Sequence, residues 1–310
     1  MTELQRARNT NSNHALPIAM GFFFFFVLPL SFFAGWFSLA YFVRAYFPTL
    51  HDKRIVLLIA HPDDEAMFFS PTVLALTQPS LRNHVKILCL CSGEDESLRE
   101  TRKSELIKSA AILGLRSPND VDVIEDTDHF PDAMTTTWAA DDIANVLSQN
   151  FVSYSVKNKQ KVSGSQTLSS SDIDIDVLIT FDNQGISSHA NHISLYYGAL
   201  HWVRKVDPSG AAVSIYSLTT TNIVRKYISL FDAPLSVLLS SLKRSGVHRS
   251  DPNPEKLIFL SNGSGYRRAQ KAMTDGHVSQ MLWFRWGWIG LSRYVSVNDL
   301  TREFPAPNLH

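Results

Sequence analysis

The sequence predicts an α/β protein: a Rossmann-like, doubly wound domain with a mainly parallel sheet, preceded by one N-terminal transmembrane helix. Short runs rich in Ile, Leu and Val recur along the chain, as expected for strands buried on both faces of a parallel sheet. Helical patterns separate these runs, and such alternation is typical of doubly wound folds. The N-terminal segment differs from the remainder because it holds one long apolar run.

That run covers residues 16–43, contains no charged side chain and ends at Arg44. A helix of about 28 residues rises about 42 Å, more than the roughly 30 Å of a hydrocarbon core. A cleavable signal peptide is the alternative, but its apolar core would be only about 7 to 15 residues. We therefore predict an N-terminal tail over residues 1–15 and a retained transmembrane helix over 16–43. Positive charges after the run, at Lys53 and Arg54, favour a cytoplasmic C-terminal domain.

The rest of the chain, residues 52–310, is expected to form one domain. Residues 153–171 are rich in Ser, Lys and Gln, so we predict a mobile surface insertion there. Helical periodicity and apolar runs locate the other elements. We predict helices at 66–76, 98–113 and 139–147, and strands at 54–60, 85–91, 121–124, 176–181, 213–218 and 257–260.

Composition excludes one class of partner. Acidic and basic residues balance to a formal net charge of +0, so the chain has no basic field of the kind that binds nucleic acid. The two cysteines, Cys89 and Cys91, would point to opposite faces of a strand and are poorly placed to pair. Their arrangement favours a reducing compartment.

Two later segments are unusually apolar, residues 228–242 and residues 281–291, the latter with aromatic side chains around Arg285. Aromatic residues beside arginine suit a membrane interface. The alternative is that both segments close the core, and the sequence leaves the two interpretations open.

The first candidate site follows the first predicted strand, where residues 61–65 read His-Pro-Asp-Asp-Glu. Ligands in such folds bind beyond the carboxyl ends of the strands. Imidazole and carboxylate suit zinc, so His61 and Asp64 could supply two ligands. The alternative is that the acidic side chains only favour the start of a helix, and we assign no more than this to Glu65.

A second cluster follows the strand at 176–181, with His189 and His192 three residues apart. On a helix the two would share a face, and one would complete a zinc site. A third strand end is followed by Arg102 and Glu105, which could contact substrate or form only an exposed ion pair. Other histidines lack a neighbouring ligand pattern and are assigned no role: His129, His201, His248 and His277.

Together these residues resemble the zinc-dependent de-N-acetylases that open with Ala/Pro-His-Pro-Asp-Asp-Glu, and within them the N-acetylglucosaminylphosphatidylinositol de-N-acetylases of GPI-anchor synthesis. The resemblance extends from about residue 54 to residue 291 and rests on three patterns. They are residues 60–71, residues 92–106 and residues 181–192.

The resemblance implies Zn²⁺, or another divalent metal, held by His61, Asp64 and His192. It also implies Asp63 as general base and His189 as an assisting residue. Candidate substrate-binding residues are Arg102 and Asp182.

The resemblance further implies that residues 52–310 are a catalytic domain that deacetylates N-acetylglucosaminyl-phosphatidylinositol at the endoplasmic reticulum membrane. The expected topology is single-pass with a cytoplasmic catalytic domain, and the sequence does not determine whether there is a protein partner. The apolar run points to a lipid substrate, since relatives that act on soluble sugars generally lack such a span. A soluble amino-sugar deacetylase and a non-catalytic lipid-binding homologue stay open as alternatives.

Overall fold

A computed structural model describes residues 20, 23–93, 95–153, 172–207, 212–242 and 252–304. The predicted tail, residues 1–15, lies outside the described residues, as does all but Ser153 of the predicted insertion, residues 153–171. Val152 and Ile173 pair as an antiparallel bridge, so the chain lies side by side before and after that insertion.

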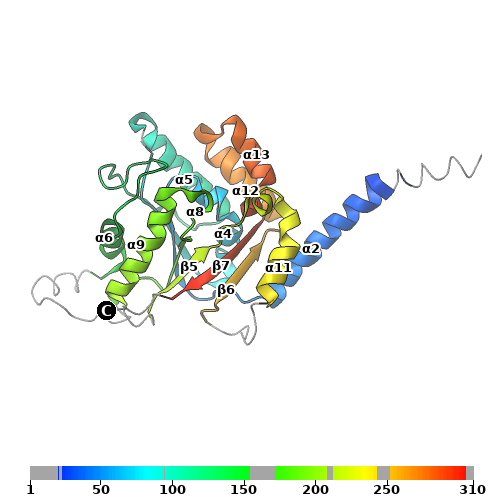
Figure 1. Cartoon of the computed structure of the whole chain (residues 1–310), viewed down its shortest axis with the longest axis horizontal. Coiled ribbons are helices and arrows are strands. Elements are labelled where there is room, and N and C mark those ends of the chain that lie inside the picture. The colour runs from blue at the N-terminus through cyan, green and yellow to red at the C-terminus, as the bar shows by residue number, and fades with distance from the viewer. Residues whose placement is uncertain are drawn as a thin grey trace, which may run out of the picture.

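Among the described residues, seven strands form one sheet in the order β3-β2-β1-β4-β5-β7-β6 (Figure 1). The five strands from β3 to β5 are parallel, whereas β7 runs antiparallel to both β5 and β6. The predicted α/β class with a mainly parallel sheet is confirmed. The strands are β1 (Arg54–Ile59), β2 (His84–Cys89), β3 (Val121–Val123), β4 (Val177–Phe181), β5 (Ser214–Leu218), β6 (Lys256–Leu260) and β7 (Val297–Glu303).

Strand β7 has no counterpart among the predicted strands, because its sequence, Val-Asn-Asp-Leu-Thr-Arg-Glu, is mostly polar. Its apolar residues Val297 and Leu300 are buried, and Asn298 is buried as well. The Asn298 amide is satisfied because it donates to the carbonyl of Phe68 and accepts from the hydroxyl of Thr72. Hydrogen bonding from another element thus makes a polar sequence acceptable in a buried strand.

Helices flank the sheet, with α6 packed on α9 at one end and α2 beside α11 at the other (Figure 1). The helix predicted at 66–76 is wrong as a single element: it is divided into two, because Pro71 lacks an N–H and suits the first turn of a helix. The main helices are α3 (Asp64–Met67), α4 (Ser70–Leu76), α5 (Arg99–Leu113), α6 (Ala140–Phe151), α8 (Gly185–Ser188), α9 (Ala190–Val206), α10 (Ile223–Lys226), α11 (Ala233–Leu242), α12 (Gly263–Lys271) and α13 (Trp283–Leu291).

From Phe23 onward, the described part of the apolar run folds as a π-helical turn, η1 (Phe23–Val27), continued by α2 (Leu28–Tyr46). Together they form a helix of 24 residues that is long and apolar enough to cross a membrane. Its C-terminal half packs on the α/β domain, where Val43 and Phe47 share a buried cluster with Ile258. The indole nitrogen of Trp36 donates to the carbonyl of Ser261 at 2.9 Å. The helix and the domain are therefore in direct contact.

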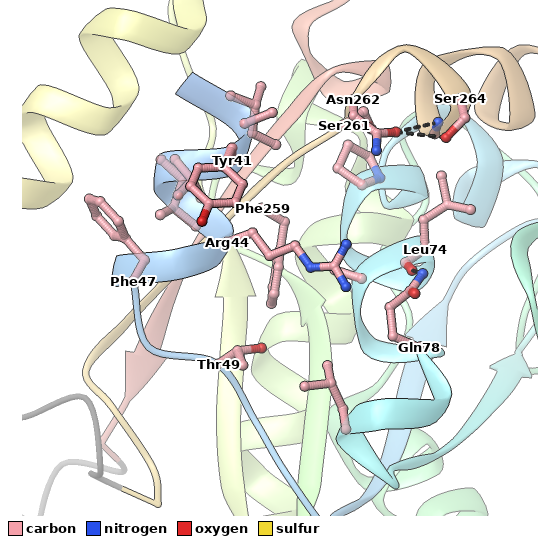
Figure 2. Close-up of a pocket in the computed structure, with 18 of the residues that line it drawn as sticks. Tyr41, Arg44, Phe47, Thr49, Leu74, Gln78, Phe259, Ser261, Asn262 and Ser264 are labelled. Atoms are coloured by element: carbon pink, nitrogen blue, oxygen red, sulfur yellow. Dashed lines mark hydrogen bonds between the residues drawn. The ribbon is translucent and has the colours of Figure 1, made fainter. Parts of the chain in front are cut away.

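A cavity of about 680 Å³ lies between the end of α2 and the α/β domain. Figure 2 shows Arg44 reaching from α2 toward Leu74 of α4 and Gln78, which follows that helix. None of the predicted site residues lines this cavity. The candidate site therefore lies elsewhere on the domain.

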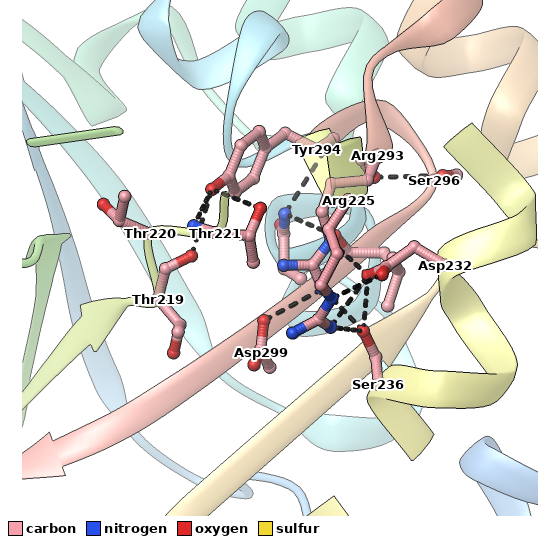
Figure 3. Close-up of polar contacts among 12 residues, drawn as sticks. Thr219, Thr220, Thr221, Arg225, Asp232, Ser236, Arg293, Tyr294, Ser296 and Asp299 are labelled. Carbon is pink, nitrogen blue, oxygen red and sulfur yellow. Dashed lines mark hydrogen bonds and ion pairs between the residues drawn. The ribbon is translucent and has the colours of Figure 1, made fainter. Parts of the chain in front are cut away.

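A buried polar cluster joins the C-terminal elements to one another (Figure 3). Arg293, in the 3₁₀ turn η9 (Arg293–Val295), and Asp232, in η6 (Ser229–Asp232), are both fully buried. Their side chains approach to 2.7 Å, and Arg225 binds the same carboxylate at 2.6 Å. Arg293 also contacts Asp299 of β7 at 3.0 Å. These ion pairs hold α10, η6 and β7 together.

Candidate metal centre

The two predicted clusters meet at one edge of the sheet. His61, Asp63 and Asp64 follow β1, while His189 and His192 follow β4. Strands β1 and β4 are parallel neighbours, so their carboxyl ends lie together. This is the edge at which ligands bind in open parallel sheets.

Three histidines, His61, His189 and His192, each offer a ring nitrogen within 4.8 Å of those of the others. Their ring centroids are 5.0 Å apart for His61 and His189 and 4.6 Å for His189 and His192. Phe181 stacks on the His192 ring at 3.8 Å between centroids and limits its rotation. The ring nitrogens of the three histidines therefore point toward one another, and the orientation of the His192 ring is fixed by packing.

Asp64 lies against this group. Its Oδ2 accepts the backbone N–H groups of Ala60 and His61, at 3.0 and 2.9 Å, and its Oδ1 lies 3.2 Å from His192 Nε2. Burial alone would raise the pKa of Asp64, but His192, His61 and these N–H donors hold it below its usual range. Asp64 is thus an ionised carboxylate with one oxygen turned to the histidines.

His192 Nε2 is a buried nitrogen without a hydrogen bond to any described residue, although Asp64 Oδ1 is 3.2 Å away. The other ring nitrogen, Nδ1, faces the carbonyl of Gly185 at 3.2 Å and would donate to it. In the neutral ring Nε2 then carries a lone pair that faces a carboxylate oxygen. Two facing acceptors fit a shared divalent cation, so the residues present suit a zinc ion.

His61 is oriented by groups that the sequence did not single out. Its Nε2 lies 3.2 Å from Asp132 Oδ1 and 3.2 Å from Asn191 Oδ1, which leaves Nδ1 turned to Asp64. Burial alone would lower the pKa of His61, but Asp132 and Asp64 raise it to about 9. A carboxylate behind a ligating histidine is a common way to set its tautomer. Asp132 stands in an irregular loop, where no periodic pattern marks it.

His189 differs from His61 in charge and in hydrogen bonding. Its Nδ1 accepts the backbone N–H of Asn191 at the start of α9. Burial, together with the charges of His192 and His61, lowers the pKa of His189 to about 4. The ring is therefore neutral near pH 7 and carries its proton on Nε2.

Asp63 is buried and has φ of 126°, a conformation that strains any residue with a side chain. Its carboxylate forms an ion pair with Arg285 of α13. Burial raises the pKa of Asp63 above its usual value, although the Arg285 charge opposes this shift. Arg285 is a site residue that the sequence placed only within an aromatic segment.

Glu65 was expected to favour a helix start, and it does lie in the first turn of α3, but its side chain also makes contacts that the sequence did not predict. The side chain is fully buried, accepts from the Ser109 hydroxyl and lies 2.7 Å from His277 Nε2. Its second oxygen accepts the backbone N–H of Asp63 at 3.2 Å. Glu65 thus holds the strained backbone of Asp63 in place. His277, which was assigned no role from the sequence, supports Glu65.

The remaining candidates lie at the margin. Arg102 packs against Gly93, where an added Cβ would fall 1.8 Å from its guanidinium. The hydrogen bond with His61 lowers the pKa of Asp132, and the charge of Arg102 adds to that shift. The exposed ion pair considered for Glu105 does not form: Glu105 is buried and binds Ser279.

Asp182 has a different environment. Its carboxylate accepts from the N–H and hydroxyl of Thr220, both at 2.6 Å, and from the N–H groups of Gln184 and Gly185 at 3.1 Å. These bonds tie the loop after β4 to the loop after β5. Asp182 is therefore engaged in positioning the turn that carries the histidines.

Comparison with known proteins identifies similar chains. The family model described as GlcNAc-PI de-N-acetylase matches residues 56–203. The N-acetylglucosaminyl-phosphatidylinositol de-N-acetylase of Arthroderma benhamiae is 39% identical over 305 residues, covering 83% of this chain and 89% of that protein. A probable enzyme of the same name from Schizosaccharomyces pombe is 37% identical, covering 81% and 87%. The Bos taurus enzyme of that name is 34% identical, covering 80% and 83%.

Proposed function

We propose, because this chain belongs to the GlcNAc-PI de-N-acetylase family, that it hydrolyses the N-acetyl group of N-acetylglucosaminyl-phosphatidylinositol. The products are acetate and glucosaminyl-phosphatidylinositol, and the reaction is an early step of GPI-anchor biosynthesis. The observation that carries the proposal is the convergence of His61, Asp64 and His192, with a buried His192 nitrogen that lacks a hydrogen bond.

These three residues are proposed to hold the metal, with Zn²⁺ as the preferred ion because imidazole and carboxylate suit it. Bound there, zinc would polarise the acetyl carbonyl and acidify the attacking water. Asp132 and Gly185 support the set, because each binds the non-ligating nitrogen of a ligand histidine.

Asp63 is proposed as the general base that accepts the proton of the attacking water. A carboxylate with a raised pKa is a better proton acceptor near neutral pH than an ordinary aspartate. Arg285 and the Glu65-bound backbone orient it. His189 is proposed to donate a hydrogen bond from Nε2 to the developing oxyanion, since its Nδ1 already accepts from Asn191.

We propose Arg102 at the margin of the centre as a substrate contact, with Asp182 as a weaker candidate because its oxygens are engaged. We also propose that the chain is a single-pass protein of the endoplasmic reticulum membrane. This proposal is supported by the apolar helix Phe23–Tyr46, the lipid substrate and the names of the homologues. Arg44, Lys53 and Arg54 favour a cytoplasmic catalytic domain.

The test uses the full chain purified in detergent and substrate labelled in the acetyl group. We expect labelled acetate to be released, lost on chelation and restored by Zn²⁺. Release that persists in chelator would overturn the metal mechanism. A soluble N-acetyl amino sugar serves as competitor; its turnover at the rate of the lipid would instead indicate a soluble-sugar deacetylase.

A further inference from the structure

Two helices of the domain present apolar side chains to the outside. On α11 and α13 these residues are more than one-third exposed, and Trp283 reaches 87%. Scattered exposed apolar residues are ordinary, but clusters on neighbouring elements indicate an interaction surface. The main members are Leu235, Leu238, Leu242, Trp283, Phe284 and Trp286.

Charged residues of the same region are turned inward, the reverse of a water-facing surface. Arg285, the one charge on α13, points to Asp63. Arg225 of α10 binds Asp232, and Lys226 lies buried against the carbonyl of Ile186. Their neighbours Ile223 and Val224 are instead exposed, and α11 carries no charge. This pattern suits an apolar medium outside the domain.

The surface is continuous with α2. The ring centroid of Phe32 on α2 lies 4.9 Å from that of Phe231 on η6. Val43 of α2 shares a buried cluster with Val237 of α11. On the other flank, Trp36 of α2 packs edge-on against Tyr266, whose hydroxyl donates to the carbonyls of Ile289 and Gly290 in α13. Figure 1 shows α2 and α11 together at one end of the sheet. A bilayer crossed by α2 would therefore meet this surface as well.

We propose that α11 and α13 insert their outer faces into the same bilayer that α2 crosses. The inference rests on the proposed function in one respect, the membrane span of α2. A lipid surface is the occupant because the surface is uncharged, rich in tryptophan and joined to a helix of membrane-spanning length.

The arrangement brings lipid close to the metal centre. The outer face of α13 carries Trp283 and Trp286. Its inner face carries Arg285, which pairs with Asp63, and Trp288, whose ring centroid lies 5.3 Å from that of Phe68. One helix thus separates the bilayer from the proposed base. A lipid substrate can then present its sugar to the centre while its acyl chains stay in the membrane.

The experiment places a fluorescent NBD label on single introduced cysteines of the full chain in phosphatidylcholine vesicles that contain spin-labelled lipid. Test positions are Leu238→Cys on α11 and Trp286→Cys on α13. Leu30→Cys on α2 is the positive control, and Asn145→Cys at an exposed position of α6 is the negative control. The native Cys89 and Cys91 are buried, so the labelled wild-type chain measures the background.

We expect spin-labelled lipid to quench the labels at 238, 286 and 30 and to leave the label at 145 unquenched. Quenching at 30 alone, with 238 and 286 behaving as 145 does, would overturn the inference and leave the span intact. No quenching at 30 either would remove the membrane span from the proposed function too. A change in NBD emission that depends on protein concentration, without quenching by lipid, would identify a second copy of the chain as the occupant. That result would overturn the inference.

A second measurement separates insertion from folding. The double variant Leu238→Glu, Leu242→Glu is expected to turn over vesicle-borne substrate roughly tenfold more slowly than wild type, because charge opposes insertion. Its turnover of a short-chain, water-soluble analogue in detergent should match wild type. A variant that matched wild type on the vesicle-borne substrate as well as on the analogue would contradict the inference. Turnover of the analogue shows that the variant is folded.

Discussion

Arg285 forms an ion pair with Asp63 although 222 positions separate them in the sequence. The arginine stands on α13, in the aromatic segment, and the aspartate stands between two proposed zinc ligands. Removing the cation should raise the pKa of Asp63 further. For Arg285→Ala we expect the acidic limb of the pH–rate profile to move to higher pH, because the base must be ionised to act.

We expect kcat for Arg285→Ala to fall by about 10- to 100-fold with zinc content unchanged. Arg285→Lys keeps the charge and should show the smaller shift of the acidic limb. An unchanged profile in Arg285→Ala would show that the ion pair does not tune the base.

Asp63→Asn removes the proposed base and keeps the size of the side chain. We expect turnover to drop by about 10²- to 10⁴-fold, the usual contribution of a general base, with metal content retained. Metal is measured by elemental analysis of the purified protein and turnover by acetate release. The exposed Asp122→Asn is the matched control; near wild-type turnover in Asp63→Asn would exclude this role.

Alanine at His61, Asp64 or His192 is expected to lose zinc and activity together. Each removes one of about three protein ligands, the usual number at a catalytic zinc. Zinc stoichiometry after dialysis checks this, with His201→Ala as control because that exposed histidine pairs only with Asp141 among the described residues. A variant that retained full zinc would have its ligand assignment withdrawn.

Glu65→Ala should destabilise the domain as well as slow the reaction. It leaves His277 and Ser109 buried without their acceptor, a loss of about 3–5 kcal/mol for a broken buried charged pair. Thermal unfolding in detergent measures the change. Glu65→Gln keeps an acceptor and should lie between the alanine variant and wild type, whereas equal melting temperatures for all three would argue against the network.

Asp232→Ala tests the buried cluster in Figure 3 and should leave the metal centre intact. Removing this carboxylate takes away the partner that Arg225 and the fully buried Arg293 share, and leaves Arg293 with Asp299. We expect the change to cost about 3–5 kcal/mol of unfolding free energy. Asp52→Ala, which breaks an exposed pair with Arg82, is the control and should leave the melting temperature nearly unchanged. Equal melting temperatures for the two variants would contradict the prediction.

Strands β1 and β4 were predictable because they are buried on both faces, and the sequence of such a strand is a nearly continuous apolar run. Strand β3 gave a weaker pattern, because Asp122 at its centre is exposed. Strand β7 was not predictable, because its polar residues are satisfied by contacts that the strand sequence does not show. Asn298 is bound by Thr72, which is distant in the sequence, and Asp299 by Arg293 of the preceding turn. The single helix expected at 66–76 failed for a local reason, the proline at position 71.

By itself, the sequence determined the fold class, the apolar N-terminal run and the residues around which the proposed chemistry is built, since motif spacing and hydrophobic periodicity are local properties. Tertiary structure alone decided how those residues are controlled. Asp132 orients His61. The pair of Glu65 and His277 holds the backbone of Asp63, and the positive charge of Arg285 favours the ionised form of the Asp63 carboxylate. Hydrogen bonds and ion pairs act over a few ångströms of space, and segments that meet there can be far apart along the chain.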